Sequence, residues 1–189
     1  METRPLYFIA VRHPEAYHSE DDNGKLTLLG EKQADALQKL VYGLRKKIAE
    51  NESGYPSPRY VRVATFSSVL NRTFQTVEKI ALFHRENIIA LKCFGKTQPS
   101  FEDAQTAFND ISGYHQNEKI IIAVCHGSMP GVLIRAAYEH FVFPIDRDVV
   151  PKDIGSNPYY ACGYILDTEN SSIEKIEVGR KIAKEYSVK

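Results

Sequence analysis

The segment Leu6-Tyr-Phe-Ile-Ala-Val-Arg12-His13 is an unbroken apolar and aromatic run that ends in two basic residues. A run without polar alternation is typical of a strand buried on both faces, as in a parallel sheet covered by helices. Residues 119–125 repeat the pattern late in the chain and are followed by His126 and Gly127. Both segments therefore predict inner strands of one sheet, each ending in polar side chains.

Segments with strand and helix patterns alternate along the rest of the chain. The expected strands are residues 6–11, 60–65, 88–93, 119–125, 159–166 and 172–178. The expected helices begin near Thr27, Ser68, Ser100 and Ser128. This alternation predicts an α/β fold with a mostly parallel central sheet in a three-layer α/β/α arrangement, and the last two strands suggest a hairpin.

The composition favours one domain spanning residues 1–189, with residues 179–189 as a loosely held tail. Lysine plus arginine and aspartate plus glutamate each number 24, which argues against a general binder of nucleic acid or membranes. The first apolar run is too short for a signal peptide or a membrane span, so a cytoplasmic location is expected. Three scattered cysteines predict buried thiols rather than a disulfide framework or zinc site.

Four chemically active side chains follow the expected strands: Arg12, His13, Arg72 and His126. Because ligands bind beyond the carboxyl ends of parallel strands, these side chains are expected to share one rim of the sheet. Guanidinium groups match paired phosphoryl oxygens, and helix amides near Ser68 and Ser128 would add donors. A neutral imidazole can attack phosphorus, while a protonated one neutralises phosphoryl oxygens. The set predicts phosphoryl transfer, although each residue alone is most simply structural or exposed.

Four short motifs, in order, resemble the histidine phosphatase or phosphoglycerate mutase-like superfamily. Its strand ending in Arg-His-Gly is similar to residues 6–14, and its Leu-Thr-x-x-Gly-x-x-Gln-Ala to Leu26-Thr-Leu-Leu-Gly-Glu-Lys-Gln-Ala34. Its Ser-x-x-x-Arg-x-x-Gln-Thr is similar to Ser68-Val-Leu-Asn-Arg-Thr-Phe-Gln-Thr76, and its late strand with His-Gly to residues 120–127. The resemblance implies a phosphoglycerate mutase-like fold, and the compact chain resembles the small members that act on phosphohistidine proteins.

The resemblance also implies roles for individual residues. His13 would be the phospho-acceptor. The phosphate pocket would consist of Arg12, His13, Arg72, His126 and Gly127. Pro14 replaces the family's glycine, so it loses an amide donor but keeps a carbonyl that could orient the His13 ring. No metal and no cofactor are expected.

The general acid and the substrate entrance are less well defined by the pattern. The family places a carboxylate after the third strand, and the nearest candidate here is Glu102, with Asp103 as the alternative. Both equally fit ordinary acidic residues in the first turn of a helix. The expected entrance residues are Tyr17, His18 and Ser19. Ser19 stands where mutases and many broad phosphatases of the family carry asparagine.

The leading hypothesis is a metal-independent phosphatase that hydrolyses a phosphomonoester or phosphoramidate through phosphorylated His13. Its substrate would be a phosphorylated small molecule or a phosphoprotein. The alternative is a catalytically weak or inactive protein of the same fold that binds phosphate or a protein partner. A sugar-phosphate mutase ranks third because the chain is short and carries Ser19.

Overall fold

The computed structural model describes residues 4–17, 24–52, 54–81, 88–91, 100–114, 118–142, 149–152, 154 and 158–187, and the structural statements below concern these residues. Their strands form one six-stranded sheet of order β3-β2-β4-β1-β5-β6. The strands are β1 (Tyr7–Arg12), β2 (Val63–Ser67), β3 (Ile88–Ala90), β4 (Ile120–Cys125), β5 (Gly163–Asp167) and β6 (Ser172–Ile176). The first four strands pair in parallel, and β5 and β6 are antiparallel, which confirms the mostly parallel sheet.

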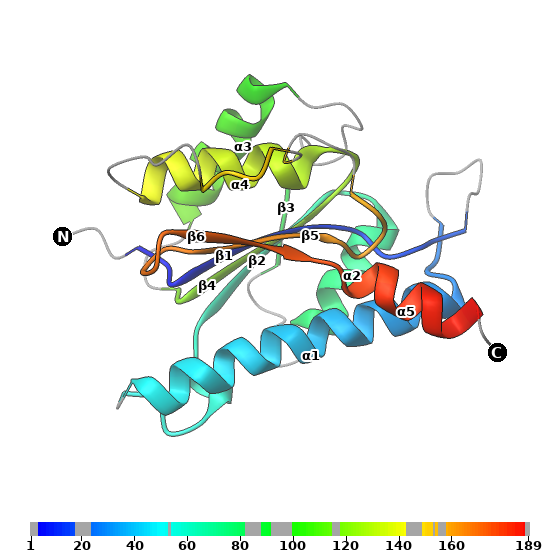
Figure 1. Ribbon diagram of the computed structural model, residues 1–189, viewed down its shortest axis with the longest axis horizontal. Helices are drawn as coiled ribbons and strands as arrows, with labels where there is room; N and C mark the ends of the chain where they lie inside the picture. The colour runs from blue at the N-terminus through cyan, green and yellow to red at the C-terminus, as the bar shows by residue number, and fades with distance from the viewer. Residues whose placement is uncertain are drawn as a thin grey trace.

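Helices cover both faces of this sheet, as Figure 1 shows. The helices are α1 (Leu28–Asn51), α2 (Asn71–Ile80), α3 (Phe101–Tyr114), α4 (Met129–Phe141) and α5 (Val178–Ser187). Helices α3 and α4 lie over one face, and α1, α2 and α5 lie over the other. The predicted three-layer α/β/α arrangement is therefore confirmed. No helix in the described ranges is long and apolar enough to cross a membrane.

Strand β1 shows why an unbroken apolar run produces these layers. Side chains alternate between the two faces of a strand. Phe8 and Ala10 accordingly join the core under α3 and α4, whereas Tyr7, Ile9 and Val11 join the core over α1 and α2. Because both faces are covered, alternate polar residues would be buried without partners, and the run has none.

Several expected bounds differ from the structure, and two of these differences concern the second strand and the end of the chain. The second strand starts at Val63 rather than residue 60, because Pro58–Tyr60 forms a short 3-10 turn before the chain joins β4. The expected loose tail is instead helix α5. Its backbone is anchored where Gln33 Nε2 donates to the Gly179 carbonyl at 3.2 Å, and Lys32 of α1 lies over the Tyr186 ring. These contacts come from α1, so local sequence near the end of the chain does not announce them.

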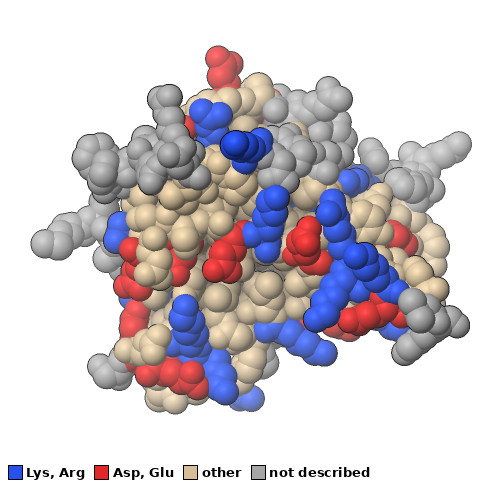
Figure 2. Space-filling model, viewed as in Figure 1, with Lys and Arg blue, Asp and Glu red and all other residues tan. Residues whose placement is uncertain are grey.

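Charged side chains of both signs lie on the face of the molecule drawn in Figure 2. On the face in Figure 2, basic and acidic side chains are interspersed rather than gathered by sign. Cys125 and Cys162 are buried and unbridged, as expected for apolar thiols, and Cys93 lies outside the described residues. Any attraction for a phosphate in this molecule must therefore come from a local cluster of groups.

Candidate functional site

The two neighbouring strands β1 and β4 bring His13 and His126 together. Arg12 pairs in register with Cys125, so each histidine is the first residue beyond the same edge of the sheet. The His13 amide continues the ladder by donating to the Cys125 carbonyl at 3.0 Å. The two imidazole centroids lie 4.6 Å apart, and both side chains are buried. The rings are close enough to contact a single small ligand.

The tautomer of His13 follows from its hydrogen bond. Its Nδ1 lies 2.6 Å from the Pro14 carbonyl oxygen, which can only accept a hydrogen bond. Nδ1 therefore carries the ring proton and Nε2 holds the lone pair. Burial above all, then repulsion from His126, lowers the pKa of His13 to about 2, although the bond to Pro14 opposes this. The ring is neutral near pH 7, which is the state a nitrogen nucleophile requires.

Two arginines place positive charge beside both rings. Burial lowers the pKa of His126 to about 3, and the charges of Arg72 and then Arg12 add to that effect. Arg12 ends β1, while Arg72 lies in the first turn of α2 directly beyond β2. A phosphoryl dianion would reverse the balance, because its charge favours the protonated imidazole. The cluster is therefore suited to an anion and disfavours a cation.

The backbone turns at Gly127, directly after His126. Its φ is 54°, in the left-handed region that glycine adopts at little cost. The turn leads into α4 at Met129, with Pro130 in the first helical turn, where a missing amide costs no hydrogen bond. A side chain at position 127 would strain the turn that holds His126 at the end of its strand.

A third segment, residues 158–162, completes the site from the side of β5. The Arg12 guanidinium lies 4.3 Å from the centroid of the Tyr160 ring and donates from Nη1 to the Pro158 carbonyl at 3.0 Å. The same ring lies 5.5 Å from that of His13. Ala161, with φ of 51°, donates its amide to the carbonyls of Arg12 and His13. This segment holds the end of β1 from one side.

The comparisons with known proteins agree with this architecture. No protein-family model and no curated protein matches the sequence. Among solved structures, a protein assigned as phosphohistidine phosphatase SixA from Nakamurella multipartitia is similar with a TM-score of 0.60 at 14% identity, covering 93% of this chain and 96% of that one. Protein histidine phosphatase SixA complexed with tungstate gives 0.55 at 12%, covering 90% and 94%. Phosphoglycerate mutase from Bacillus anthracis gives 0.54 at 12%, covering 97% of each chain. This chain has the phosphoglycerate mutase-like fold.

Within the phosphoglycerate mutase-like fold, the motif at residues 26–34 holds the loop that follows His13. Gln33 Oε1 accepts from the Glu15 amide at 2.8 Å, and Thr27 donates to the Glu15 carboxylate at 3.0 Å. Thr27 also caps α1 by accepting from the Gly30 amide. A Cβ at Gly30 would overlap the Glu15 carbonyl oxygen, so glycine is required there by close approach. The motif therefore holds the loop after His13 in place through contacts with Glu15.

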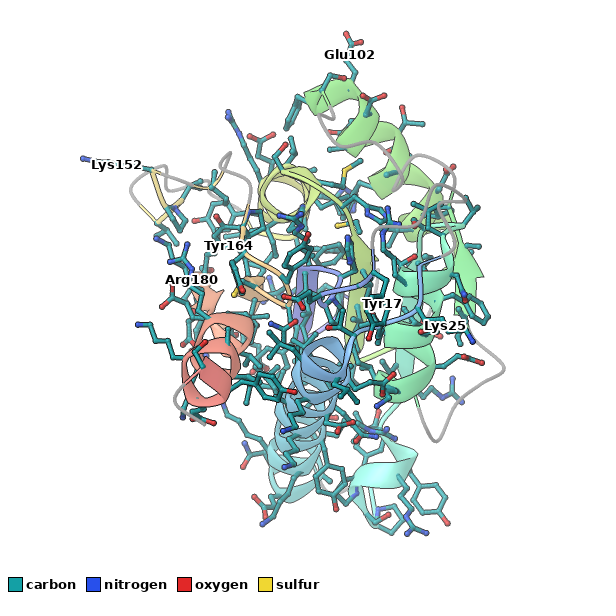
Figure 3. The ribbon with its side chains drawn as sticks, turned by 90° about the vertical axis from the view of Figure 1, so that its right-hand side faces the viewer. Tyr17, Lys25, Glu102, Lys152, Tyr164 and Arg180 are labelled. Atoms are coloured by element: carbon teal, nitrogen blue, oxygen red, sulfur yellow. The ribbon has the colours of Figure 1, made fainter. Side chains whose placement is uncertain are left out.

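The two candidates for the general acid lie in the first turn of α3. Glu102 is exposed in the first turn of α3, and Figure 3 shows it pointing away from the molecule. Asp103 and Ser100 cap the same helix reciprocally, each amide bonding the other side chain. The capping bond accounts for the position of Asp103, and the helix N-terminus favours a carboxylate at Glu102. A general-acid role for either residue stays a prediction.

The expected entrance residues belong to the loop after β1, and one site residue that the sequence did not predict, Tyr160, lies just before β5. The Tyr17 side chain is 60% exposed, and the Tyr17 amide donates to the Lys25 carbonyl. Figure 3 shows the two residues close to each other. His18 and Ser19 lie outside the described residues. Tyr160 was missed, because its segment predicted a strand from residue 159 whereas β5 begins at Gly163. Only the antiparallel pairing of β5 with β1 places Tyr160 against Arg12.

Proposed function

We propose that this protein is a phosphatase that hydrolyses a phosphomonoester or phosphoramidate through a phosphohistidine on His13. The proposal rests above all on the 2.6 Å bond between His13 Nδ1 and the Pro14 carbonyl. That bond leaves the Nε2 lone pair of a neutral ring free to attack phosphorus. In the first step the Nε2–P bond forms as the bond from phosphorus to the leaving group breaks, and in the second step water replaces Nε2.

Charge around the ring supports the same chemistry. Arg12 and Arg72 supply fixed positive charge, and guanidinium groups bind phosphoryl oxygens in pairs. His126 is positioned to accept a proton once an anion is bound, and its imidazolium would then stabilise charge on the transferring oxygens. No part of this requires a metal ion or another cofactor. A bound tungstate in the similar structure of SixA is consistent with an oxyanion site in this fold.

The electrostatic surroundings of the histidines favour a substrate with a good leaving group. The charged groups that shift the pKa of His13 are His126 and the two arginines, and those that shift the pKa of His126 are the two arginines alone. No carboxylate of the described residues contributes to either shift. Without an acid from the described residues, an alkoxide leaving group would depart unprotonated and slowly. A phosphoramidate, acyl phosphate or phosphoanhydride leaves more readily. We therefore expect a phosphorylated protein or small molecule of this kind as the substrate.

The decisive experiment measures hydrolysis of an aryl phosphate in excess chelator and traps the phosphoenzyme. We expect turnover, with acid-labile, alkali-stable label on the protein. His13→Asn should abolish the label and lower kcat by ~10³-fold or more. His140→Asn is the matched control, because His140 is exposed on α4 and outside this site. Full activity in His13→Asn would refute the proposal.

The lack of a carboxylate among the described groups that shift the two histidines also favours a second candidate, a protein that binds phosphate or a phosphorylated partner with little turnover. In that case vanadate or phosphate would bind, and no member of a broad panel of phosphoesters, acyl phosphates and phosphoramidates would be hydrolysed. Isomerisation of a phosphoglycerate without release of phosphate would instead indicate a mutase.

A further inference from the structure

A chain of hydroxyl groups lies behind His126, on the side of β2. The Ser68 amide bonds to the Val124 carbonyl, which extends the pairing of β2 with β4 and puts Ser68 beside His126. Ser68 Oγ lies 2.9 Å from His126 Nε2 and 2.7 Å from Thr73 Oγ1. Ser68 and Thr73 are fully buried, so water does not compete for these bonds.

Counting protons along this chain fixes the direction of each bond. Thr73 Oγ1 lies 2.6 Å from the Leu70 carbonyl oxygen and 3.1 Å from the Ser68 carbonyl oxygen. Because a carbonyl oxygen can only accept, the Thr73 hydrogen is directed at these carbonyls. Thr73 has only one hydroxyl hydrogen, so Ser68 must donate in the bond between the two hydroxyls. Ser68 then has no hydrogen left for His126.

The lone pairs of Ser68 complete the count. One accepts from the Leu70 amide at 3.2 Å, and the other faces His126 Nε2. Since Ser68 can only accept there, His126 Nε2 must carry a proton. In a neutral ring the lone pair is then on Nδ1, to which no described residue hydrogen-bonds.

We propose that Ser68 and Thr73 are positioning residues that fix His126 in the Nε2–H tautomer, so that Nδ1 is the nitrogen that receives a proton and meets a bound phosphoryl group. The role in catalysis, though not the tautomer itself, rests on the proposed function. The proton comes from a monoanionic phosphoryl group. It moves to His126 Nδ1, and the resulting phosphoryl dianion accepts a hydrogen bond from the imidazolium. The two histidines hold opposite tautomers, with Nε2 bare on His13 and Nδ1 bare on His126.

The tautomers can be read directly by NMR in the ligand-free protein at neutral pH, with ¹⁵N-labelled histidine. We expect a pyridine-type shift for Nδ1 and a pyrrole-type shift for Nε2 of His126, and the reverse for His13. Thr73→Val keeps the shape of the side chain but frees the Ser68 hydrogen to point at His126, so the His126 signals should move toward a mixture. His13 serves as the internal control, and Thr73→Ser should restore the wild-type signals.

Activity gives a second, independent reading. Ser68→Ala should lower kcat by ~10- to 100-fold with a much smaller change in KM, because the ring and its ligand stay in place while the proton is misdirected. A pyrrole-type Nδ1 on His126 in the wild type would overturn the proposal. So would tautomer signals that are unchanged in both Thr73→Val and Ser68→Ala. Because the NMR experiment needs no turnover, an inactive protein with the expected tautomers would refute the proposed function and leave the tautomer assignment standing.

Discussion

Replacing Gly30 by alanine tests whether the loop after His13 depends on close contact with α1. An added Cβ would overlap the carbonyl oxygen of Glu15, which is backbone and cannot rotate away. The loop must then move off the helix. Three hydrogen bonds to Glu15 are lost or lengthened: one from its amide to Gln33, one from the Thr27 amide to its carbonyl, and one from the Thr27 hydroxyl to its carboxylate.

The size of the effect follows from these bonds. Each is worth about 0.5–1.5 kcal/mol, so losing them costs about 2–4 kcal/mol. Alanine favours the helix over glycine by about 1 kcal/mol, which offsets part of that loss. We expect Gly30→Ala to lower the free energy of unfolding by about 1–3 kcal/mol. Because Pro14 adjoins Glu15, its carbonyl should also move away from His13 Nδ1 and kcat should fall.

Urea unfolding followed by circular dichroism measures this change. Gly43→Ala is the matched control, since Gly43 lies in the same helix with open space around its Cβ position. It gains the same helix propensity without a clash and should raise the free energy of unfolding by up to about 1 kcal/mol. If Gly30→Ala proves as stable as Gly43→Ala, the contact with Glu15 is not a constraint and the reasoning fails.

Four further predictions concern the site. Arg72→Ala should weaken vanadate binding by ~10- to 100-fold in calorimetry, through loss of charge-assisted hydrogen bonds worth about 1.5–3 kcal/mol, and unchanged affinity would exclude Arg72 from the anion site. The pKa values of His13 and His126 lie below the value near 6.5 of an unfolded histidine, so the unfolded state binds more protons as the pH falls. The free energy of unfolding should therefore be greatest above pH ~6.5 and decline towards pH ~3. Each ring should contribute up to ~1.4 kcal/mol per pH unit to this decline. Replacing both rings by glutamine should flatten urea-unfolding stability over that window, and an equal acid sensitivity would contradict the buried neutral state. Tyr160→Leu should lower kcat/KM for an aryl phosphate by roughly tenfold, since the cation–π contact with Arg12 contributes about 1–2 kcal/mol, whereas Tyr160→Phe should retain activity. Glu102→Gln should leave kcat and its pH profile unchanged, and a clear loss would return that carboxylate to the mechanism.

The sequence predicted most strands and helices because apolar runs and helix caps depend on residues that are close together in the chain. An unbroken apolar run such as Ile120–Cys125 is typical of a strand buried on both faces, and all six of its residues are buried in β4. Thr27 was expected to cap a helix, and it does so by accepting from the Gly30 amide. The rule that parallel strands carry ligands at their carboxyl ends then places His13 and His126 on one rim.

The errors occurred where distant segments decide the outcome. Residues 179–187 are a helix because α1 offers a surface for them, and an isolated helix of that length is marginal in water. Tyr160 reached the site through the pairing of β5 with β1, although its own neighbours predicted a strand. An acidic first turn is also ambiguous from sequence, because Asp103 caps α3 with Ser100 and such a cap needs no role in chemistry.

The sequence by itself determined the layers, the succession of strands and helices along the chain, and which four candidate side chains, Arg12, His13, Arg72 and His126, follow strands. Those properties depend on periodicity and on which residues follow a strand. Only the tertiary structure decided which ring nitrogens carry protons and which cations surround them. A tautomer depends on single acceptors such as the Pro14 carbonyl and the Ser68 hydroxyl, and their positions are set to within a fraction of an ångström by packing between segments far apart in the chain.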